Sequence, residues 1–169
     1  MNQAAMLILS LGLLANIAPP AGAADSPALR ASSPFFSPAA LAVSPDAKTL
    51  FIACATANQV LVFDTALPGL GGSIQMPAGP SGLALSRDGA RLYITCAAPA
   101  STVVIWDAAR ECLLDQIPAG HTAMAPVLSP DEATLYVCNR FNHTISFLDL
   151  ATRTETHRVA VAREPVAAA

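Results

Sequence analysis

The amino-acid sequence predicts an all-β chain of repeated four-stranded antiparallel sheets, and three observations support this prediction. One segment occurs three times, beginning at Ser44, Ser86 and Ser129, so the copies are 42 and 43 residues apart. Each copy contains short apolar strands separated by turn residues. No amphipathic segment of helical periodicity follows the N-terminal apolar run. A period of about 40–45 residues built from short strands is typical of propeller blades.

Each repeat supplies four strands in the same order. The first and second strands flank a Ser-Pro-Asp or Ser-Arg-Asp turn, in which Asp accepts hydrogen bonds from the turn. A three-residue loop of this kind places its third position in the left-handed region, which falls on Ala47, Gly89 and Glu132. The expected strands are 40–43, 50–53, 60–63 and 72–76, then 82–85, 92–95, 103–106 and 112–117, then 125–128, 135–138, 145–148 and 156–161.

The third strands are nearly continuous apolar runs, which indicates sheets covered on both faces. Blades stacked radially satisfy that requirement. We therefore expect a partial β-propeller over 37–169. Its parts are blade 1 at 37–78, blade 2 at 79–120, blade 3 at 121–163 and the start of a fourth blade at 164–169. A closed ring has about 4 to 8 blades, so the sequence predicts about three blades in an open arc, as an N-terminal fragment of a larger propeller.

The N-terminus carries an apolar run at 4–18, followed by Pro19-Pro20 and the small residues Ala21-Gly22-Ala23. This pattern predicts a signal peptide at 1–23, although Met1-Asn2-Gln3 lacks the usual basic residue; a buried N-terminal helix is the alternative. An Ala-, Ser- and Pro-rich linker follows at 24–36. We expect an extracytoplasmic mature chain (periplasmic, secreted or at the cell surface) without a membrane span.

Composition narrows the classes of partner. The chain is 53% apolar and 12% charged, which is typical of a chain with a large core, and its net charge is −3. It contains no basic cluster, so neither nucleic acid nor an anionic membrane surface is expected as a partner. The expected partner is therefore a protein or a small-molecule ligand, whose identity the sequence does not indicate.

The four cysteines do not match a cofactor or metal motif. The sequence lacks Cys-x-x-Cys-His, which excludes covalent haem attachment in this chain, and it lacks Cys-x2-Cys metal spacing. Cys54 and Cys96 occupy equivalent positions in neighbouring repeats, too far apart to pair if sheets face each other at about 10 Å. Cys112 begins an outer strand and is expected to be the exposed thiol. No cofactor-binding or metal-ligating residue is assigned.

The recurring aspartates have two interpretations. Paired carboxylates are able to act as acid and base, but aspartates at strand–turn junctions more often accept turn hydrogen bonds, and this structural interpretation is favoured. No catalytic residue is therefore assigned. The six positions concerned are Asp46, Asp64, Asp88, Asp107, Asp131 and Asp149.

Two loop types that emerge on the same face of a propeller carry the candidate ligand-binding residues. Asn142 and His143 lie at the tip between the second and third strands of the last repeat, and His121 lies in the link before it. Arg140 and Arg163 are placed to join them. Binding residues concentrate on such loops, and the alternative is that these side chains are simply solvated.

The composite repeat Ser-Pro-Asp-x-x-x-Leu-Tyr-Val-x-Asn, ending in a strand before Asp, resembles the YVTN-type β-propeller repeat of bacterial extracytoplasmic proteins. The third copy matches best through Tyr136-Val-Cys-Asn139, Asn142 and Asp149, whereas the others have Cys54 and Cys96 where the family has Asn. The resemblance implies a larger, seven-bladed whole. Related propellers include surface-layer proteins, a haem-binding nitrite reductase, seven-bladed lactonases and propellers fused to c-type cytochromes.

The sequence favours a non-enzymatic binding or interaction scaffold. The resemblance adds two alternatives: the N-terminal propeller of an extracytoplasmic redox protein with a haem-bearing c-type cytochrome region downstream, or a lactonase-like hydrolase. None of the catalytic residues of those relatives can be placed on this sequence, and a fold by itself does not determine a function.

Overall fold

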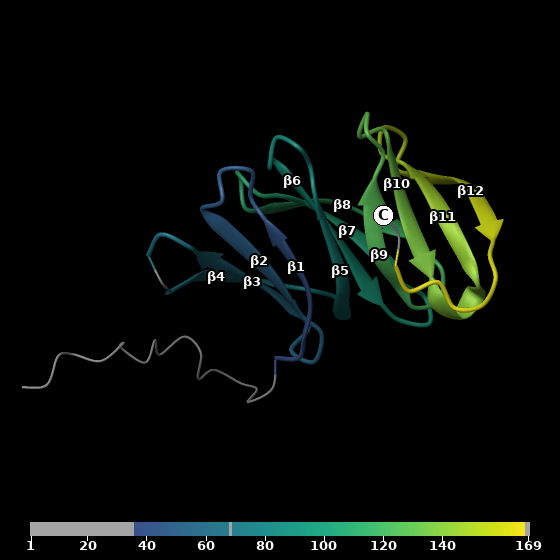
Figure 1. Ribbon diagram of the computed structural model, residues 1–169, viewed down its shortest axis with the longest axis horizontal. Helices are drawn as coiled ribbons and strands as arrows, with labels where there is room; N and C mark the ends of the chain where they lie inside the picture. The colour runs from purple at the N-terminus through teal and green to yellow at the C-terminus, as the bar shows by residue number, and fades with distance from the viewer. Residues whose placement is uncertain (1–35, 68, 168–169) are drawn as a thin grey trace, which may run out of the picture.

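The computed structural model describes residues 36–67 and 69–167, and the predicted signal peptide (1–23) and most of the predicted linker (24–36) lie outside the described residues. The described chain forms three four-stranded antiparallel sheets that stand side by side in an open arc (Figure 1). The predicted all-β fold of three blades is confirmed. Blade 1 contains β1 (Pro38–Val43), β2 (Thr49–Cys54), β3 (Gln59–Asp64) and β4 (Gly69–Gln75). Blade 2 contains β5 (Gly79–Leu85), β6 (Arg91–Ala97), β7 (Thr102–Asp107) and β8 (Cys112–Pro118). Blade 3 contains β9 (Ala123–Leu128), β10 (Thr134–Asn139), β11 (Thr144–Asp149) and β12 (Thr154–Ala160).

Every blade is a meander in which each strand pairs with the next one along the chain. The first strands β1, β5 and β9 lie against each other on the inner side of the arc, and β4, β8 and β12 are the outer strands (Figure 1). The inner strands approach so closely that a Cβ atom at Gly82 would collide with Pro126 and with the Thr95 hydroxyl. Glycine is therefore required where β5 passes β9.

The core consists of two apolar layers between neighbouring blades. The first layer joins blade 1 to blade 2 and includes Phe51, Val60, Leu92 and Ile94. The second layer joins blade 2 to blade 3 and includes Tyr93, Ile105, Leu135, Val137 and Leu148. Blade 2 therefore has both faces covered, which explains why its strand β7 reads as a continuous apolar run.

Blade 1, at one end of the arc, carries an apolar face that no other described residue covers. On blade 1, Leu41 is 62% exposed and Val43 is 54% exposed. Their repeat equivalents in blade 2, Leu83 and Leu85, pack against blade 1. The outward face of blade 1 thus has the same apolar character as a face that is buried one repeat later.

The Ser-x-Asp turns are built in the same way in all three blades. In blade 2 the Ser86 hydroxyl donates to Asp88 Oδ1 at 2.6 Å and accepts from the Arg91 N–H at 2.9 Å, while the Ala90 N–H donates to Asp88 Oδ1. The third turn positions have φ of 57° at Ala47, 73° at Gly89 and 57° at Glu132. The predicted left-handed conformation is confirmed at each of them.

One short element was not predicted. The tip of blade 3, expected as an irregular loop, contains the 3-10 turn η2 (Arg140–Asn142), which ends at His143 with a left-handed φ of 55°. Within the described ranges, no helix has the length and apolar character needed to cross a membrane.

Candidate functional site

The loops of the three blades fall at two opposite ends of the sheets because neighbouring strands are antiparallel. One end carries the tips between the second and third strands together with the links between blades. The other end carries the Ser-x-Asp turns and the turns after the third strands. Each end holds one candidate site.

At the first end, four of the predicted residues gather around the ring of Phe141. Together they form what we call the loop surface: His121, Arg140, Phe141, Asn142 and His143. The Asn142 side-chain oxygen accepts a hydrogen bond from the His121 backbone N–H at 2.5 Å. The Phe141 N–H donates to the His121 carbonyl at 3.4 Å. These bonds tie the link between blades 2 and 3 to the tip of blade 3.

Phe141 is the residue that the sequence analysis missed. Its side chain is 48% exposed, yet it is held in place: the His121 ring meets it edge-on with ring centroids 5.2 Å apart, and the Arg140 guanidinium lies 5.0 Å from its centroid. The sequence did hold one indication of its role: Phe141 is an apolar residue in an otherwise polar loop tip. An ordered, exposed aromatic ring with polar neighbours is the kind of residue that anchors partners at interfaces.

The segment after blade 3 also contacts the loop surface. Arg140 donates to Glu164 Oε2 through two nitrogens, at 3.0 and 3.1 Å, and the Glu164 N–H donates to His143 Nδ1 at 3.0 Å. Arg163, the fifth residue predicted for this site, is exposed and forms no hydrogen bond or ion pair with the described residues. Four of the five predicted residues are therefore brought together.

A buried polar residue, Asn139, supports the loop surface from below through hydrogen bonds. Its side-chain oxygen accepts from the Gly120 N–H at 2.9 Å, and its amide donates to Ser146 and Thr144. A Cβ atom at Gly120 would collide with the side chains of Asn139 and Asn142. Gly120 thus lets two asparagine side chains approach one backbone link, which fixes the position of His121.

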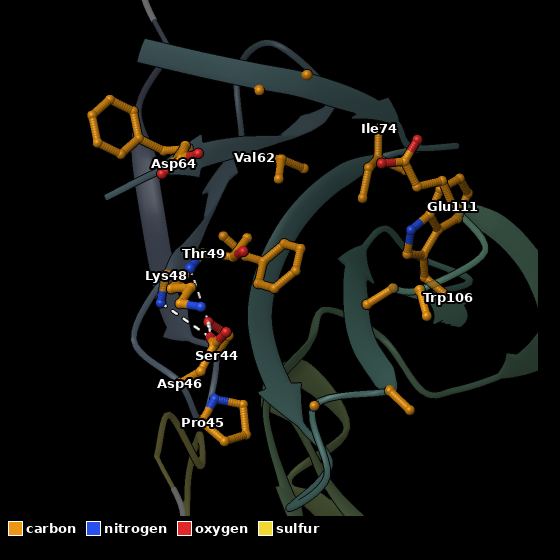
Figure 2. A pocket seen from close by; sticks show the side chains of 18 of the residues that line it. Ser44, Pro45, Asp46, Lys48, Thr49, Val62, Asp64, Ile74, Trp106 and Glu111 are labelled. Atoms are coloured by element: carbon orange, nitrogen blue, oxygen red, sulfur yellow. Dashed lines mark hydrogen bonds between the residues drawn. The ribbon is translucent and has the colours of Figure 1, made fainter. Parts of the chain in front are cut away.

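At the other end, a cleft of about 780 Å³ opens between blade 1 and blade 2, and we call it the interblade cleft. Its wall includes Phe51, Val62, Ile74 and Trp106. Figure 2 shows Trp106 and Glu111 on one side and Ser44, Asp46 and Lys48 on the other. The charged residues that line it are Asp46, Lys48, Asp64, Asp88 and Glu111. This volume lies within the usual range for small-molecule sites.

The turn aspartates are occupied by hydrogen bonds, as the structural interpretation of the sequence predicted. The Ser44 hydroxyl and then the Lys48 N–H lower the pKa of Asp46; Ser86 and Ala90 do the same for Asp88. Ser129 and Ala133 lower the pKa of Asp131. These carboxyls are therefore ionised at neutral pH and do not carry a proton that they could donate.

The cysteines lie where the sequence placed them. All four thiols are free, so Cys54 and Cys96 do not pair, and Cys112 is the exposed one. Burial raises the pKa of Cys96 to about 11 and also raises the pKa of Cys54 and of Cys138. Within the described residues, no group of three or more His, Cys, Asp or Glu side chains is arranged to hold a metal ion.

The comparisons with known proteins bear on the fold. No family model matches the sequence, and no curated protein matches it. Among solved structures, the chain is similar to the hydrazine synthase of Kuenenia stuttgartiensis, with a TM-score of 0.72 and 23% identity over 82% of this chain and 40% of that one.

Two further solved structures are similar at lower identity. U3-55K matches with a TM-score of 0.68 and 15% identity over 79% of this chain and 42% of its own, and the WD40 repeats of RRP9 match with the same TM-score and identity over 79% and 41%. The chain spans about two fifths of the length of these structures. At such identities the similarity establishes the fold alone: the chain is folded like part of a β-propeller.

Proposed function

We propose that this chain is the propeller part of an extracytoplasmic protein that acts as a non-enzymatic binding scaffold, and that a protein partner docks on the loop surface. Phe141 carries this proposal. Exposed apolar residues are common on protein surfaces, but this ring is fixed between Arg140 and His121. Aromatic and Arg side chains are enriched where partners bind.

The surroundings of Phe141 support a docking role. The loop surface is assembled from the link before blade 3, the tip of blade 3 and the segment after it, so it is fixed by contacts between distant segments. A preordered surface loses little conformational entropy when a partner binds. The turn aspartates and His143 are engaged in holding loops together, which favours a binding role over an acid–base role.

Site-specific photo-crosslinking in the native cell tests the proposal. A photoreactive phenylalanine analogue replaces Phe141 in one variant and replaces Leu113, which is 50% exposed on the outer strand β8, in the control. We expect one discrete adduct from position 141 that is absent from position 113, and we expect Arg140→Ala to reduce its yield. Equal labelling from both positions, or no adduct at all, would contradict the proposal.

The second candidate is a propeller within a larger redox enzyme. It is supported by the resemblance to propellers fused to c-type cytochromes and by the similarity in fold to a protein named hydrazine synthase. An absorbance spectrum of the protein purified from its native source separates the two. A visible haem band favours the redox enzyme, and its absence favours the scaffold.

A further inference from the structure

A comparison of the repeats explains why the interblade cleft is open. The same junction occurs twice, between blades 1 and 2 and between blades 2 and 3, so the second junction shows what normally fills the space. There, Leu114 and Leu150 pack against the apolar layer. Their equivalents at the first junction are Gly71 and Ala108, both of which line the cleft. Two leucine side chains are thus missing from the first junction.

The charges at the two junctions differ as well. Arg153, just before β12, reaches across from blade 3 to Asp115 of blade 2 at 2.7 Å. The equivalents of Arg153 and Asp115 at the first junction are Glu111 and Gly72. Arg153 and Glu111 share the same left-handed backbone conformation, with φ of 58° and 53°. Glu111 therefore occupies the position of a bridging cation, and a Cβ atom placed on Gly72 would meet only open space.

Compared with the junction between blades 2 and 3, the junction between blades 1 and 2 therefore lacks apolar side chains and a positive charge. Glu111 forms no ion pair or hydrogen bond with the described residues. Around it, three more carboxylates and one ammonium group line the cleft. Trp106 adds an aromatic wall, which favours cations through its π face.

We propose that the interblade cleft binds a small organic cation, whose amine or guanidinium group pairs with Glu111 and whose apolar body occupies the space that Leu114 and Leu150 fill at the next junction. The cation thus restores an ion pair across the junction with the charges reversed: Glu111 lies where Arg153 lies at the next junction, and the cation takes the place of Asp115. Because the loop surface lies at the opposite end of the blades, this site goes beyond the proposed docking role and stands or fails independently of it.

Trp106 provides a direct measurement because it is the single tryptophan of the sequence and lines the cleft. The probes are 2-phenylethylamine, the uncharged 2-phenylethanol and the anionic 3-phenylpropionate, which share one apolar body. We expect 2-phenylethylamine to change the Trp106 fluorescence saturably and to bind about tenfold more tightly than 3-phenylpropionate. The difference between these two probes should shrink at high salt.

Variants of the cleft locate the site. Glu111→Gln should weaken 2-phenylethylamine binding about threefold to fivefold, as expected for a partly exposed ion pair, and should leave 2-phenylethanol unchanged. Glu155→Gln is the matched control, because it removes the same charge from blade 3 and should change neither affinity. The double substitution Gly71→Leu and Ala108→Leu should abolish binding and raise the melting temperature, since it rebuilds the packing of the next junction.

Three outcomes would overturn the proposal. The first is equal affinity for all three probes, which would remove the role of charge. The second is unchanged binding in the double variant with a raised melting temperature, which would place the probe elsewhere. The third is an absence of saturable binding by the amine while the parent protein shows its normal cooperative unfolding.

Discussion

Ala47 carries a steric cost that glycine would avoid. Its φ of 57° matches the 73° of Gly89 in the equivalent turn, and both N–H groups donate to the carbonyl of the turn serine. We expect Ala47→Gly to stabilise the protein by up to about 1 kcal/mol, because glycine adopts this conformation without a clash between Cβ and the backbone. Urea unfolding measures the change.

The control for this substitution is Ala90→Gly in the equivalent turn of blade 2, one position after Gly89, where φ is not positive. That change should destabilise the protein, because it adds freedom only to the unfolded chain. If both variants lost stability, the turn would not carry the proposed strain. Glu132 shares the left-handed φ, but its carboxylate accepts from the Arg87 N–H across the blade junction. Glu132→Gly would relieve the same steric cost but would also remove this contact, so we expect a smaller gain in stability there than at Ala47→Gly.

Thiol reactivity should separate Cys112 from the buried cysteines. The pKa of Cys96 is raised to about 11 by burial, so its reactive thiolate is scarce at neutral pH and also inaccessible. We expect a thiol reagent to modify Cys112 alone in the folded protein and all four cysteines in denaturant. Mass spectrometry counts the adducts, and Cys112→Ser should abolish the fast reaction. Rapid modification of Cys96 in the folded protein would contradict the buried position.

Acid should remove the contribution of the turn aspartates. The pKa of Asp88 is lowered from 3.8 in the folded protein, chiefly by the Ser86 hydroxyl, so its stabilising effect is present above about pH 3.8 and is lost as pH falls through the lower folded value. We expect Asp88→Asn to be less stable than the parent at neutral pH and to match it more closely near pH 2. A stability difference that stayed constant over this range would rule out the linkage.

At the scale of the element, the sequence predicted which segments form strands because apolar residues and turn residues repeat with the same spacing three times. The left-handed turn positions were also predicted, since Gly89 marks the position that Ala47 and Glu132 share. The strands extend past the apolar runs, as in β6, which begins at Arg91. Polar residues at strand ends take part in the backbone hydrogen bonds of the sheet, but they do not show in the apolar pattern from which the strands were predicted.

The candidate sites were harder to predict because they depend on relations between blades. The grouping of His121 with His143 followed from loop topology, but the central place of Phe141 depends on η2, a local turn without a sequence signature. The interblade cleft is created by missing side chains, Gly71 and Ala108, and a missing side chain becomes visible only when the filled junction is compared with it.

For the whole molecule, the apolar outward face of blade 1, which no other described residue covers, predicts self-association of this polypeptide. Leu41 and Val43 are exposed on the outward face of blade 1, and exposed apolar faces of this kind favour aggregation. We expect the mass measured by light scattering to rise with protein concentration. The pair of substitutions Leu41→Asp and Val43→Asp should lower that mass, whereas Leu113→Asp on the outer strand of blade 2 should not. A stable, dilute monomer that unfolds cooperatively would defeat this prediction.

The meander order of every sheet has a consequence for how the chain is made. In the part of the chain that the structure describes, every strand pairs only within its own blade, so a blade can complete its backbone ladder once about 40 residues have left the ribosome. Each completed blade then offers an apolar face on which the next one condenses, and the order of synthesis becomes the order of assembly. A nascent chain of this design exposes only the outward face of blade 1 and the free face of its newest blade, which limits the opportunity for pairing between neighbouring chains on a polysome.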